Sequence, residues 1–266
     1  MTFAAATLLL VACTSTNQPS APPTIAPRLP VASEVVSITD GDTLQVMTSE
    51  QELSVRLAAI NAPDLGECLH EEATAHLMAR VSNAPISLEV VGIDQFDRTL
   101  AHVLFDDRHI NHEMVAIGLA LVSDPVDDPY RAVLLDAEEA AFDTGMGLWA
   151  GDACGVGPPS PDIAIDPAAS EPDPRGPDED RLGDEVVTVA NQGTETVDIS
   201  GWTLRDTSSR HRYTFPEGTV VGPGEAFEVR SDHPGWSPGS SAVWNNDGDM
   251  ALLLDPVGQV VSRWRY

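Results

Sequence analysis

Two polar, proline-rich segments divide this chain and constrain its fold more than any other feature. The first covers residues 14–32 and consists of Ser, Thr, Pro and Ala with few large apolar side chains. The second covers residues 155–183 and adds acidic residues to the prolines, as in PSPDIAIDPAASEPDPRGPDED. Such compositions bury too little apolar surface to offset the entropy of ordering the chain. We therefore predict a disordered tether, a first domain over residues 33–154, an extended acidic linker, and a second domain over residues 184–266.

The first 13 residues have the character of an export signal. Residues 3–12 are apolar but too few to span a bilayer. They lead into LVAC at positions 10–13, which resembles the cleavage box of bacterial lipoproteins, in which the cysteine becomes the lipidated first residue. We predict a signal peptide over residues 1–13, lipidation of Cys13, and anchoring to the outer face of the cell membrane. A secretory signal without lipidation is the alternative, since no Lys or Arg precedes the apolar segment.

The chain is strongly acidic and contains no lysine. It has 42 acidic residues against 14 arginines, which gives a formal net charge of −28. Both halves contribute, because residues 34–154 carry 23 acidic residues and 5 arginines, and residues 155–266 carry 19 acidic residues and 8 arginines. Acidity on this scale is typical of solubility or salt adaptation rather than of one binding site. Such a surface repels nucleic acid unless metal ions or local arginines intervene.

The apolar pattern of the first block changes from strands to helices along the chain. EVVSITDGDTLQVM predicts two strands joined by a turn, QELSVRLAAI a third strand, and ISLEVV and TLAHVLF two more. Helical spacing covers residues 71–81 and 111–119, and a last helix follows Pro129. This order indicates an α+β domain in which helices pack against a small barrel.

Several charged residues of the first block are candidates for a site, although each has an ordinary structural explanation. Asp40 and Asp42 lie in TDGDT, a string that is typical of a hairpin turn. Arg56 lies in the third strand, where a single arginine is usually exposed or ion-paired. Asp64 ends VRLAAINAPD, and Arg98 precedes the fifth strand. No single one of these residues establishes a function.

Taken together, the motifs resemble the thermonuclease (staphylococcal-nuclease-like) family over about residues 34–154. The resemblance rests on VxxxxDGDT, VRLxxINAP, Cys68 with EEATAHL, the DRxLA strand, and GLW before Cys154. It implies a five-stranded oligonucleotide-binding-type (OB-type) β-barrel with helices packed against it. It also implies a disulfide between Cys68 and Cys154, which are the two cysteines that follow the predicted signal. Closing a loop of that size contributes on the order of 4 kcal/mol in the chain-entropy model.

The resemblance further implies a Ca²⁺ site and a phosphodiesterase site. The metal ligands would be the Asp42 carboxylate, Asn61 at a position where the family has an acid, and the main-chain oxygen of Ala62. Calcium accepts six to eight oxygen ligands, so an amide reduces the affinity without removing the site. The catalytic residues would be Arg56 and Arg98, which bind phosphate oxygens, and Asp64, which positions or deprotonates water where the family usually has a glutamate.

Histidine pairs offer a second kind of metal site. His109 and His112, and likewise His70 and His76, have spacings that place two imidazoles on one face of a helix. No third ligand is grouped with either pair in the sequence, so we expect exposed or locally hydrogen-bonded histidines.

The second block has the short, evenly spaced strands of an all-β immunoglobulin-like sandwich. The segments VVTVANQGTETVDISGWTLRD, YTFPEGTVVGPGEAFEVR and WNNDGDMALLLDPVGQVV resemble the lamin-tail domain, which implies an accessory binding module with an unidentified ligand. Its arginines either form one basic patch or are scattered over the surface, and the second arrangement is the expected one. These are Arg205, Arg210, Arg212, Arg263 and Arg265.

Together these features predict an exported, monomeric, Ca²⁺-dependent nuclease that acts on DNA or RNA and carries a lamin-tail binding module. The alternative is a cell-surface scaffold that binds nucleic acid or protein through a weakened or inactive barrel. The aspartate at position 64, the absence of lysine and the negative charge favour this alternative. A large gain in activity in Asp64→Glu would distinguish a detuned enzyme from a scaffold.

Overall fold

The structure is a computed structural model of the whole chain. It describes residues 31–82, 85–106, 108–123, 127–155, 160, 162–174, 181–208, 210–237, 239, 243–245 and 248–266. The predicted signal peptide, Cys13 and the tether up to residue 30 lie outside the described residues. Among the helices of these described ranges, none is both long and apolar enough to cross a membrane.

The first domain is built on a closed five-stranded barrel. Its strands follow the order β3-β2-β1-β5-β6, and a parallel pairing of β3 with β6 closes the sheet. Alternation along β2 and β3 turns Leu44, Val46, Val55 and Leu57 into the barrel, where none is exposed. The closed barrel confirms the predicted OB-type fold. The strands are β1 (Val31–Ile38), β2 (Thr43–Met47), β3 (Glu52–Leu57), β5 (Ile86–Ile93) and β6 (Thr99–Phe105), with β7 (Arg108–His109) added beside β6.

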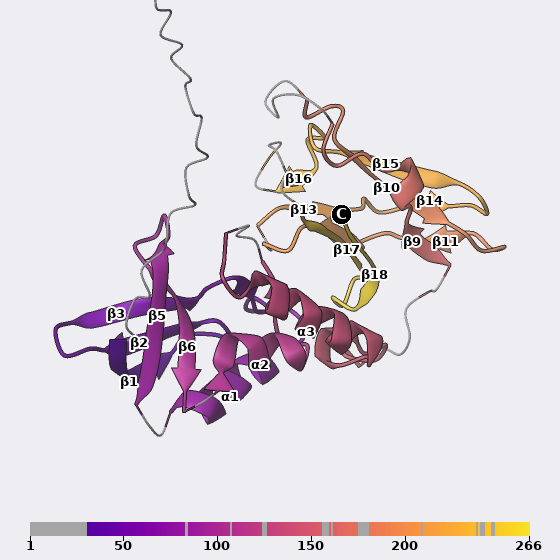
Figure 1. Cartoon of the computed structure of the whole chain (residues 1–266). Coiled ribbons are helices and arrows are strands. Elements are labelled where there is room, and N and C mark those ends of the chain that lie inside the picture. Colours follow the sequence, from indigo (N-terminus) through magenta and orange to yellow (C-terminus); the bar gives the residue numbers. More distant parts are fainter. Residues whose placement is uncertain are drawn as a thin grey trace, which may run out of the picture.

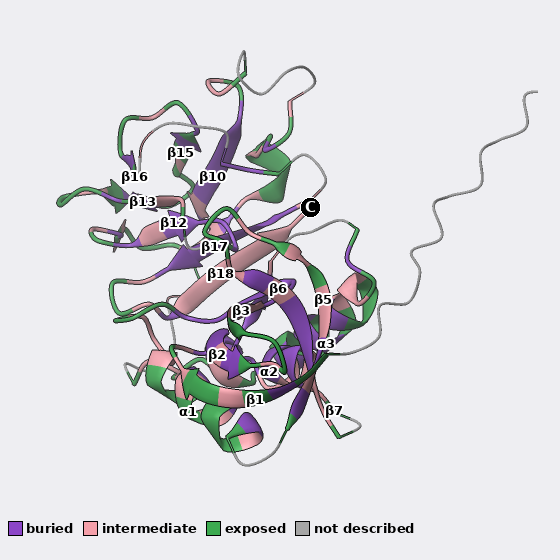
Figure 2. Cartoon of the chain, turned by 90° about the vertical axis from the view of Figure 1, so that its left-hand side faces the viewer, coloured by how far each residue is buried: buried purple, intermediate pink, exposed green. Residues whose placement is uncertain are grey.

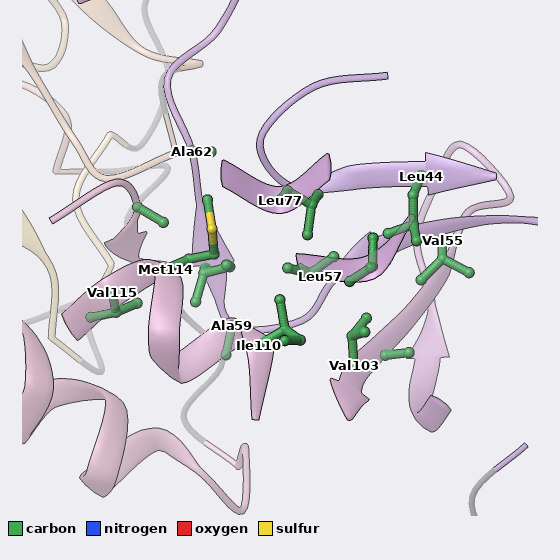
Figure 3. Packing of buried hydrophobic residues seen from close by; sticks show 14 of the residues in the cluster. Leu44, Val55, Leu57, Ala59, Ala62, Leu77, Val103, Ile110, Met114 and Val115 are labelled. Atoms are coloured by element: carbon green, nitrogen blue, oxygen red, sulfur yellow. The ribbon is translucent and has the colours of Figure 1, made fainter. Parts of the chain in front are cut away.

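Three helices pack against the barrel where the periodicity predicted them. They are α1 (His70–Val81), α2 (Ile110–Ala116) and α3 (Arg131–Asp143). Figure 3 shows Leu77 of α1 and Ile110 and Met114 of α2 among the buried barrel side chains. A short pair, β4 (Ile60–Asn61) with β8 (Leu121–Val122), connects the barrel to these helices. The core therefore extends from the barrel interior to the helical layer.

The second domain is a β-sandwich, as predicted. One sheet has the order β15-β10-β9, a second has the order β16-β13-β12-β17-β18, and β11 pairs with β14. Figure 2 shows β10 and β17 as largely buried strands of this domain. The bounds are β9 (Ile163–Ile165), β10 (Val186–Asn191), β11 (Val197–Asp198), β12 (Thr203–Arg205), β13 (Arg212–Thr214), β14 (Val220–Val221), β15 (Ala226–Arg230), β16 (Trp236–Ser237), β17 (Met250–Leu254) and β18 (Val260–Arg265), with short 3₁₀ turns at η1 (Gly147–Trp149) and η2 (Pro167–Ala169).

The predicted linker over residues 155–183 contains a strand of the second domain, while its residues 156–159, 161 and 175–180 lie outside the described residues. Strand β9 lies inside it and pairs antiparallel with β10, and Glu171 forms a further bridge with Val186. The side chains of Ile163 and Ile165 are buried in the sandwich core, which stabilises this short strand. The second domain therefore begins about 20 residues earlier than the composition suggested, and β1 likewise begins inside the predicted tether.

The two domains are joined by a packed interface as well as by the chain. Figure 1 shows α3 between the barrel and strands β17 and β18. A buried cluster joins Leu121 and Trp149 of the first domain to Met250 and Leu252 of the second. The Gln259 side chain donates to the main-chain oxygen of Ala150 at 2.7 Å. Apolar packing of this kind holds the sandwich in one orientation against α3.

The arginines of the second domain are neither one basic patch nor randomly scattered. Four of them pair with glutamates of the first domain, so they serve the interface. Arg205 and Arg212 pair with Glu67, Arg263 with Glu139, and Arg265 with Glu138.

The Cys68 and Cys154 side chains form a disulfide, with 5.6 Å between their Cα atoms. It connects the start of α1 to the segment that follows α3. The second domain lies against this bridge, since the main-chain nitrogen of Cys154 donates to Gln259 Oε1 at 3.3 Å. The disulfide therefore restrains both the helical layer and the start of the second domain.

Hydrogen bonds link Asp128, His102 of β6 and His109 of β7 in a chain that we call the histidine relay. His102 is fully buried, and its Nε2 lies 2.8 Å from Asp128 Oδ2, while its Nδ1 lies 3.0 Å from His109 Nε2. The Tyr130 ring packs against both imidazoles, with 4.4 Å between ring centroids. The pKa of His109 is lowered to about 4, mainly by burial and then by the neighbouring His102 and His112. His109 therefore remains neutral in the folded protein.

This relay predicts a loss of stability in mild acid. The unfolded chain binds a proton on His109 at about pH 6.5 and the folded chain only at about pH 4, so stability falls as the pH decreases through that window. In His109→Gln, the decrease in Tm between pH 7 and pH 5 should be smaller than in the parent protein. His233→Gln, in the second domain, is the control. An unchanged pH dependence in His109→Gln would contradict this account.

Candidate active site

The centre of the site is a buried carboxylate in the turn between β1 and β2. Asp42 is only 3 % exposed. Its Oδ1 accepts hydrogen bonds from Arg56 Nη1 and, at 2.9 Å, from the Thr43 hydroxyl. The β2–β3 register pairs Thr43 with Arg56, which explains why the guanidinium of β3 reaches this turn. A buried carboxylate is stable only with such partners, so the ion pair with Arg56 compensates its charge.

The turn that carries Asp42 requires glycine at position 41. A Cβ atom on Gly41 would lie 2.7 Å from the Cβ atoms of Ala62 and Ala73. Ala73 belongs to α1, so the turn is pressed between this helix and the segment after β4. The DGD string is therefore both a turn and a site, because the close approach that excludes a side chain at Gly41 also buries Asp42.

The segment after β4 supplies the next two residues. The main-chain nitrogen of Ala62 donates to Asp42 Oδ2 at 2.8 Å. Arg56 Nη2 donates to Asn61 Oδ1 at 2.6 Å, so one guanidinium bonds to both Asp42 and Asn61. The structure thus brings together four residues that the sequence analysis proposed for the site.

The electrostatics of Asp42 follow from its burial. Burial raises the pKa of Asp42 to about 6, and Asp40 adds to this rise, while Arg56 and the hydrogen bonds from Ala62 and Thr43 oppose it. The carboxylate is therefore held in its charged form by a small number of specific contacts. A cation close to it is electrostatically favoured.

Arg98 lies just before β6, the strand that pairs with β3, and its side chain pairs with Asp94. It precedes β6 by one residue, two positions before Leu100, which is the register partner of Arg56. Its Nε donates to Asp94 Oδ2 at 2.7 Å, and its guanidinium lies 5.5 Å from the Phe96 ring centroid. Arg98 therefore occupies the neighbouring strand end, with its side chain held by the turn before β6.

Asp64 lies at the exposed end of the VRLAAINAPD segment. Its side chain is 66 % exposed, and its main-chain nitrogen donates to Glu67 Oε2 at 2.8 Å. The nearest cation that the structure pairs with its carboxylate is Arg212 of the second domain, at 4.0 Å. The Asp64 carboxylate is therefore exposed and lies at the domain boundary, beside Arg212.

Glu67, Arg205 and Arg212 were not proposed as site residues from the sequence. Glu67 accepts hydrogen bonds from both arginines, across sequence separations of 138 and 145 residues. No local motif marks contacts over such distances. The only signal was the occurrence of arginines in a second domain that is itself acidic.

The donor atoms around Asp42 are oxygens, the ligand type that a hard cation such as calcium prefers. The Asp42 carboxylate, the side-chain carbonyl of Asn61 and the main-chain carbonyl of Ala62 are oxygen donors, and among the described residues Oδ2 of Asp42 accepts one hydrogen bond, from the main-chain nitrogen of Ala62. A carboxylate oxygen has two lone pairs, so Oδ2 retains one for a metal. These three oxygen donors include one carboxylate, that of Asp42. Within the described ranges, no group of three or more His, Cys, Asp or Glu residues is arranged to hold a metal.

The first domain is an OB-type β-barrel protein domain with a carboxylate and a guanidinium clustered at the ends of its strands. Comparison with known families shows to which family it belongs. Residues 54–151 match the staphylococcal nuclease homologue family, and residues 158–266 match the lamin tail domain. The chain belongs to the staphylococcal nuclease homologue family, with a lamin tail domain after the nuclease-homologous one.

Curated relatives share a segment of similar sequence with this chain. An uncharacterized endonuclease of Haemophilus influenzae is 37 % identical over 118 residues, which span 44 % of this chain and 65 % of the relative. A micrococcal nuclease of Shigella flexneri is 30 % identical over 125 residues, or 44 % of this chain and 72 % of the relative. An uncharacterized endonuclease of Escherichia coli O157:H7 is 30 % identical over 121 residues, or 45 % of this chain and 77 % of the relative.

Proposed function

We propose that this protein is a Ca²⁺-dependent nuclease that hydrolyses phosphodiester bonds of DNA or RNA. The observation that carries the proposal is the buried Asp42 cluster, in which one guanidinium of a nuclease-homologous barrel bonds to both Asp42 and Asn61. A site for phosphodiester hydrolysis needs fixed positive charge, because attack by water adds charge to phosphoryl oxygens that are already anionic. Arg56 is the best-placed protein group for that role.

In the proposed mechanism, two arginines bind the phosphate. Arg56 presents a planar fork at the end of β3, and Arg98 presents a second fork from the adjacent strand end after exchanging its contact with Asp94 for one with substrate. Asp64 positions or deprotonates the attacking water. Its exposed side chain is free of the burial that fixes Asp42, which suits a group that has to approach a substrate bound at the surface.

Asp42, Asn61 and the Ala62 carbonyl would hold the calcium ion. When bound, the ion supplies positive charge against the phosphoryl oxygens and compensates the buried Asp42 charge that Arg56 now balances alone. The metal proposal rests on the oxygen donors of this chain together with the family resemblance.

The charge deficit at Asn61 gives a test of the metal site. Asn61→Asp should tighten Ca²⁺ binding on the order of tenfold, since one more carboxylate faces the ion and a tenfold change is about 1.4 kcal/mol. Gln51→Glu, at an exposed glutamine just before β3, adds the same charge elsewhere in the domain and is the control. Isothermal titration with Ca²⁺ measures both. Equal affinity in Asn61→Asp and the parent protein would place the metal elsewhere.

Export and anchoring are part of the proposal. The LVAC sequence supports lipidation of Cys13 and a position on the outer face of the cell membrane. The disulfide of the first domain is in keeping with an oxidising compartment. We propose a monomer whose lamin-tail domain contributes to binding. Mass spectrometry of the mature N-terminus tests the lipid anchor.

A scaffold that binds nucleic acid without cleaving it is the second candidate. It is favoured by one observation: the exposed Asp64 side chain lies next to Arg212 of the second domain rather than in the Asp42 cluster. Digestion assays on single-stranded DNA and RNA separate the two candidates. Cleavage that requires Ca²⁺ supports the nuclease, whereas Ca²⁺-dependent binding without cleavage supports the scaffold.

A further inference from the structure

A pocket of about 290 Å³ lies between the two domains, directly beside the end of VRLAAINAPD. Its walls include Pro63 and Glu67 from the first domain and Arg205 and Arg212 from the second. A volume of this order approaches the lower end of small-ligand sites, so the pocket is larger than a single ion requires. Neither domain alone forms it, and it adjoins Asp64 through Pro63.

The wall of the pocket contains a buried guanidinium with unused hydrogen-bonding capacity. Arg205 is only 5 % exposed. Its Nη1 lies 3.4 Å from Glu67 Oε1, and its Nε has no hydrogen-bond partner within the described part of the chain. A buried, incompletely hydrogen-bonded guanidinium keeps positive charge at the wall of the pocket, which favours an anionic ligand there.

The rim of the pocket carries the second arginine. Arg212 pairs with the same Glu67 oxygen, remains about one third exposed, and approaches the Asp64 carboxylate to 4.0 Å. Asp255 also lines the pocket, but its Oδ1 already accepts hydrogen bonds from the main-chain nitrogens of Val257 and Gln259. Two guanidinium groups thus share one partly buried carboxylate at the boundary of the proposed active site.

We propose that this interdomain pocket binds a phosphate of the substrate strand adjacent to the scissile phosphodiester, through Arg212 at the rim and Arg205 in the wall. The inference rests on the proposed nuclease function and assigns the lamin-tail domain a part in it. The first domain, whose residues 34–154 carry 23 acidic residues and 5 arginines, repels a polyanion. The second domain supplies cations where the strand leaves the site, so the substrate site is incomplete without it.

The test uses the full chain and two substrates in the presence of Ca²⁺. One is a single-stranded DNA oligonucleotide, and the other is bis(p-nitrophenyl) phosphate, a phosphodiester with no flanking phosphate. Arg212→Gln should raise KM for the oligonucleotide about five- to tenfold. Because Arg212 also lies 4.0 Å from the Asp64 carboxylate, the small substrate reports any effect on catalysis itself, and kcat/KM should fall five- to tenfold more for the oligonucleotide than for the small substrate. The dependence of log(kcat/KM) on log salt should become shallower by about 0.7, the contribution of one phosphate contact on a single strand.

Arg263→Gln is the control for domain docking. It removes the interdomain pair with Glu139, whose atoms are 2.7 Å apart, without touching the pocket. Its KM and salt dependence should equal those of the parent protein. An equal rise in KM in both variants would overturn the proposal, because domain docking would then explain the effect.

The remaining outcomes separate this inference from the proposed function. If the parent protein is active and Arg212→Gln changes neither KM nor the salt dependence, the inference fails and the nuclease stands. Competition by inorganic phosphate that Arg212→Gln relieves, with no change in oligonucleotide KM, would assign the pocket to free phosphate and also overturn it. If the parent protein cleaves neither substrate, the nuclease fails, and fluorescence anisotropy with the labelled oligonucleotide decides whether Arg212→Gln weakens binding five- to tenfold as stated or not at all.

Discussion

Arg56→Ala is expected to lower the rate of phosphodiester hydrolysis by at least about 10³-fold, the scale on which an arginine stabilises a phosphoryl-transfer transition state. The guanidinium is the group that bonds to both Asp42 and Asn61, so its removal takes away the phosphate ligand and the counter-charge of the buried carboxylate together. Initial rates on single-stranded DNA with Ca²⁺ measure the effect.

Two further variants distinguish a loss of catalysis from a loss of the folded structure. Arg56→Lys retains the charge against Asp42 but loses the planar fork, so it should fold and still lose most of the activity. Arg108→Ala, at an exposed arginine of the same domain, should retain the full rate. Full activity in a folded Arg56→Ala protein would move the active site away from the Asp42 cluster.

Asp64→Glu is expected to increase activity by up to about 10²-fold. A general base must come within about 2.6 to 3.2 Å of its proton carrier, and a misplacement of about 1 Å costs roughly this factor. One additional methylene shortens the gap between the exposed carboxylate and a phosphate bound at Arg56. The change should appear in kcat more than in KM, because Asp64 acts on water.

Asp136→Glu, an exposed aspartate on α3, is the matched control and should leave the rate unchanged. A rate in Asp64→Glu that equals the parent rate would show that this carboxylate does not limit catalysis. An inactive parent protein that remains inactive as Asp64→Glu would favour the scaffold.

The fold was largely predictable because its patterns are local. Alternating residues such as Leu44 and Val46 mark the barrel strands, and the 3.6-residue spacing around Leu77 marks α1. The linker was misjudged because β9 has only two buried side chains, Ile163 and Ile165, within a proline-rich and acidic segment. Its order comes from pairing with β10, a tertiary contact that composition does not report.

The site was predictable where its residues lie close in the sequence or in strand register. Asp42 and Arg56 meet through the β2–β3 hairpin, and Asn61 follows on the same segment. The role of Glu67 could not be predicted, because its two arginine partners belong to another domain. Hydrogen bonding of His109 agrees with the expectation for the histidines, but its partners could not be predicted, since His102 and Asp128 come from different elements of the first domain and meet only in the folded core.

The most direct test of the central claim is the initial rate of single-stranded DNA hydrolysis by the purified full chain, measured with Ca²⁺, with excess chelator, and in Arg56→Ala. We expect cleavage with Ca²⁺, and almost none with chelator or in the variant. Absence of cleavage by the parent protein with Ca²⁺, under conditions in which a control nuclease is active, would contradict the account, as would equal rates in all three samples.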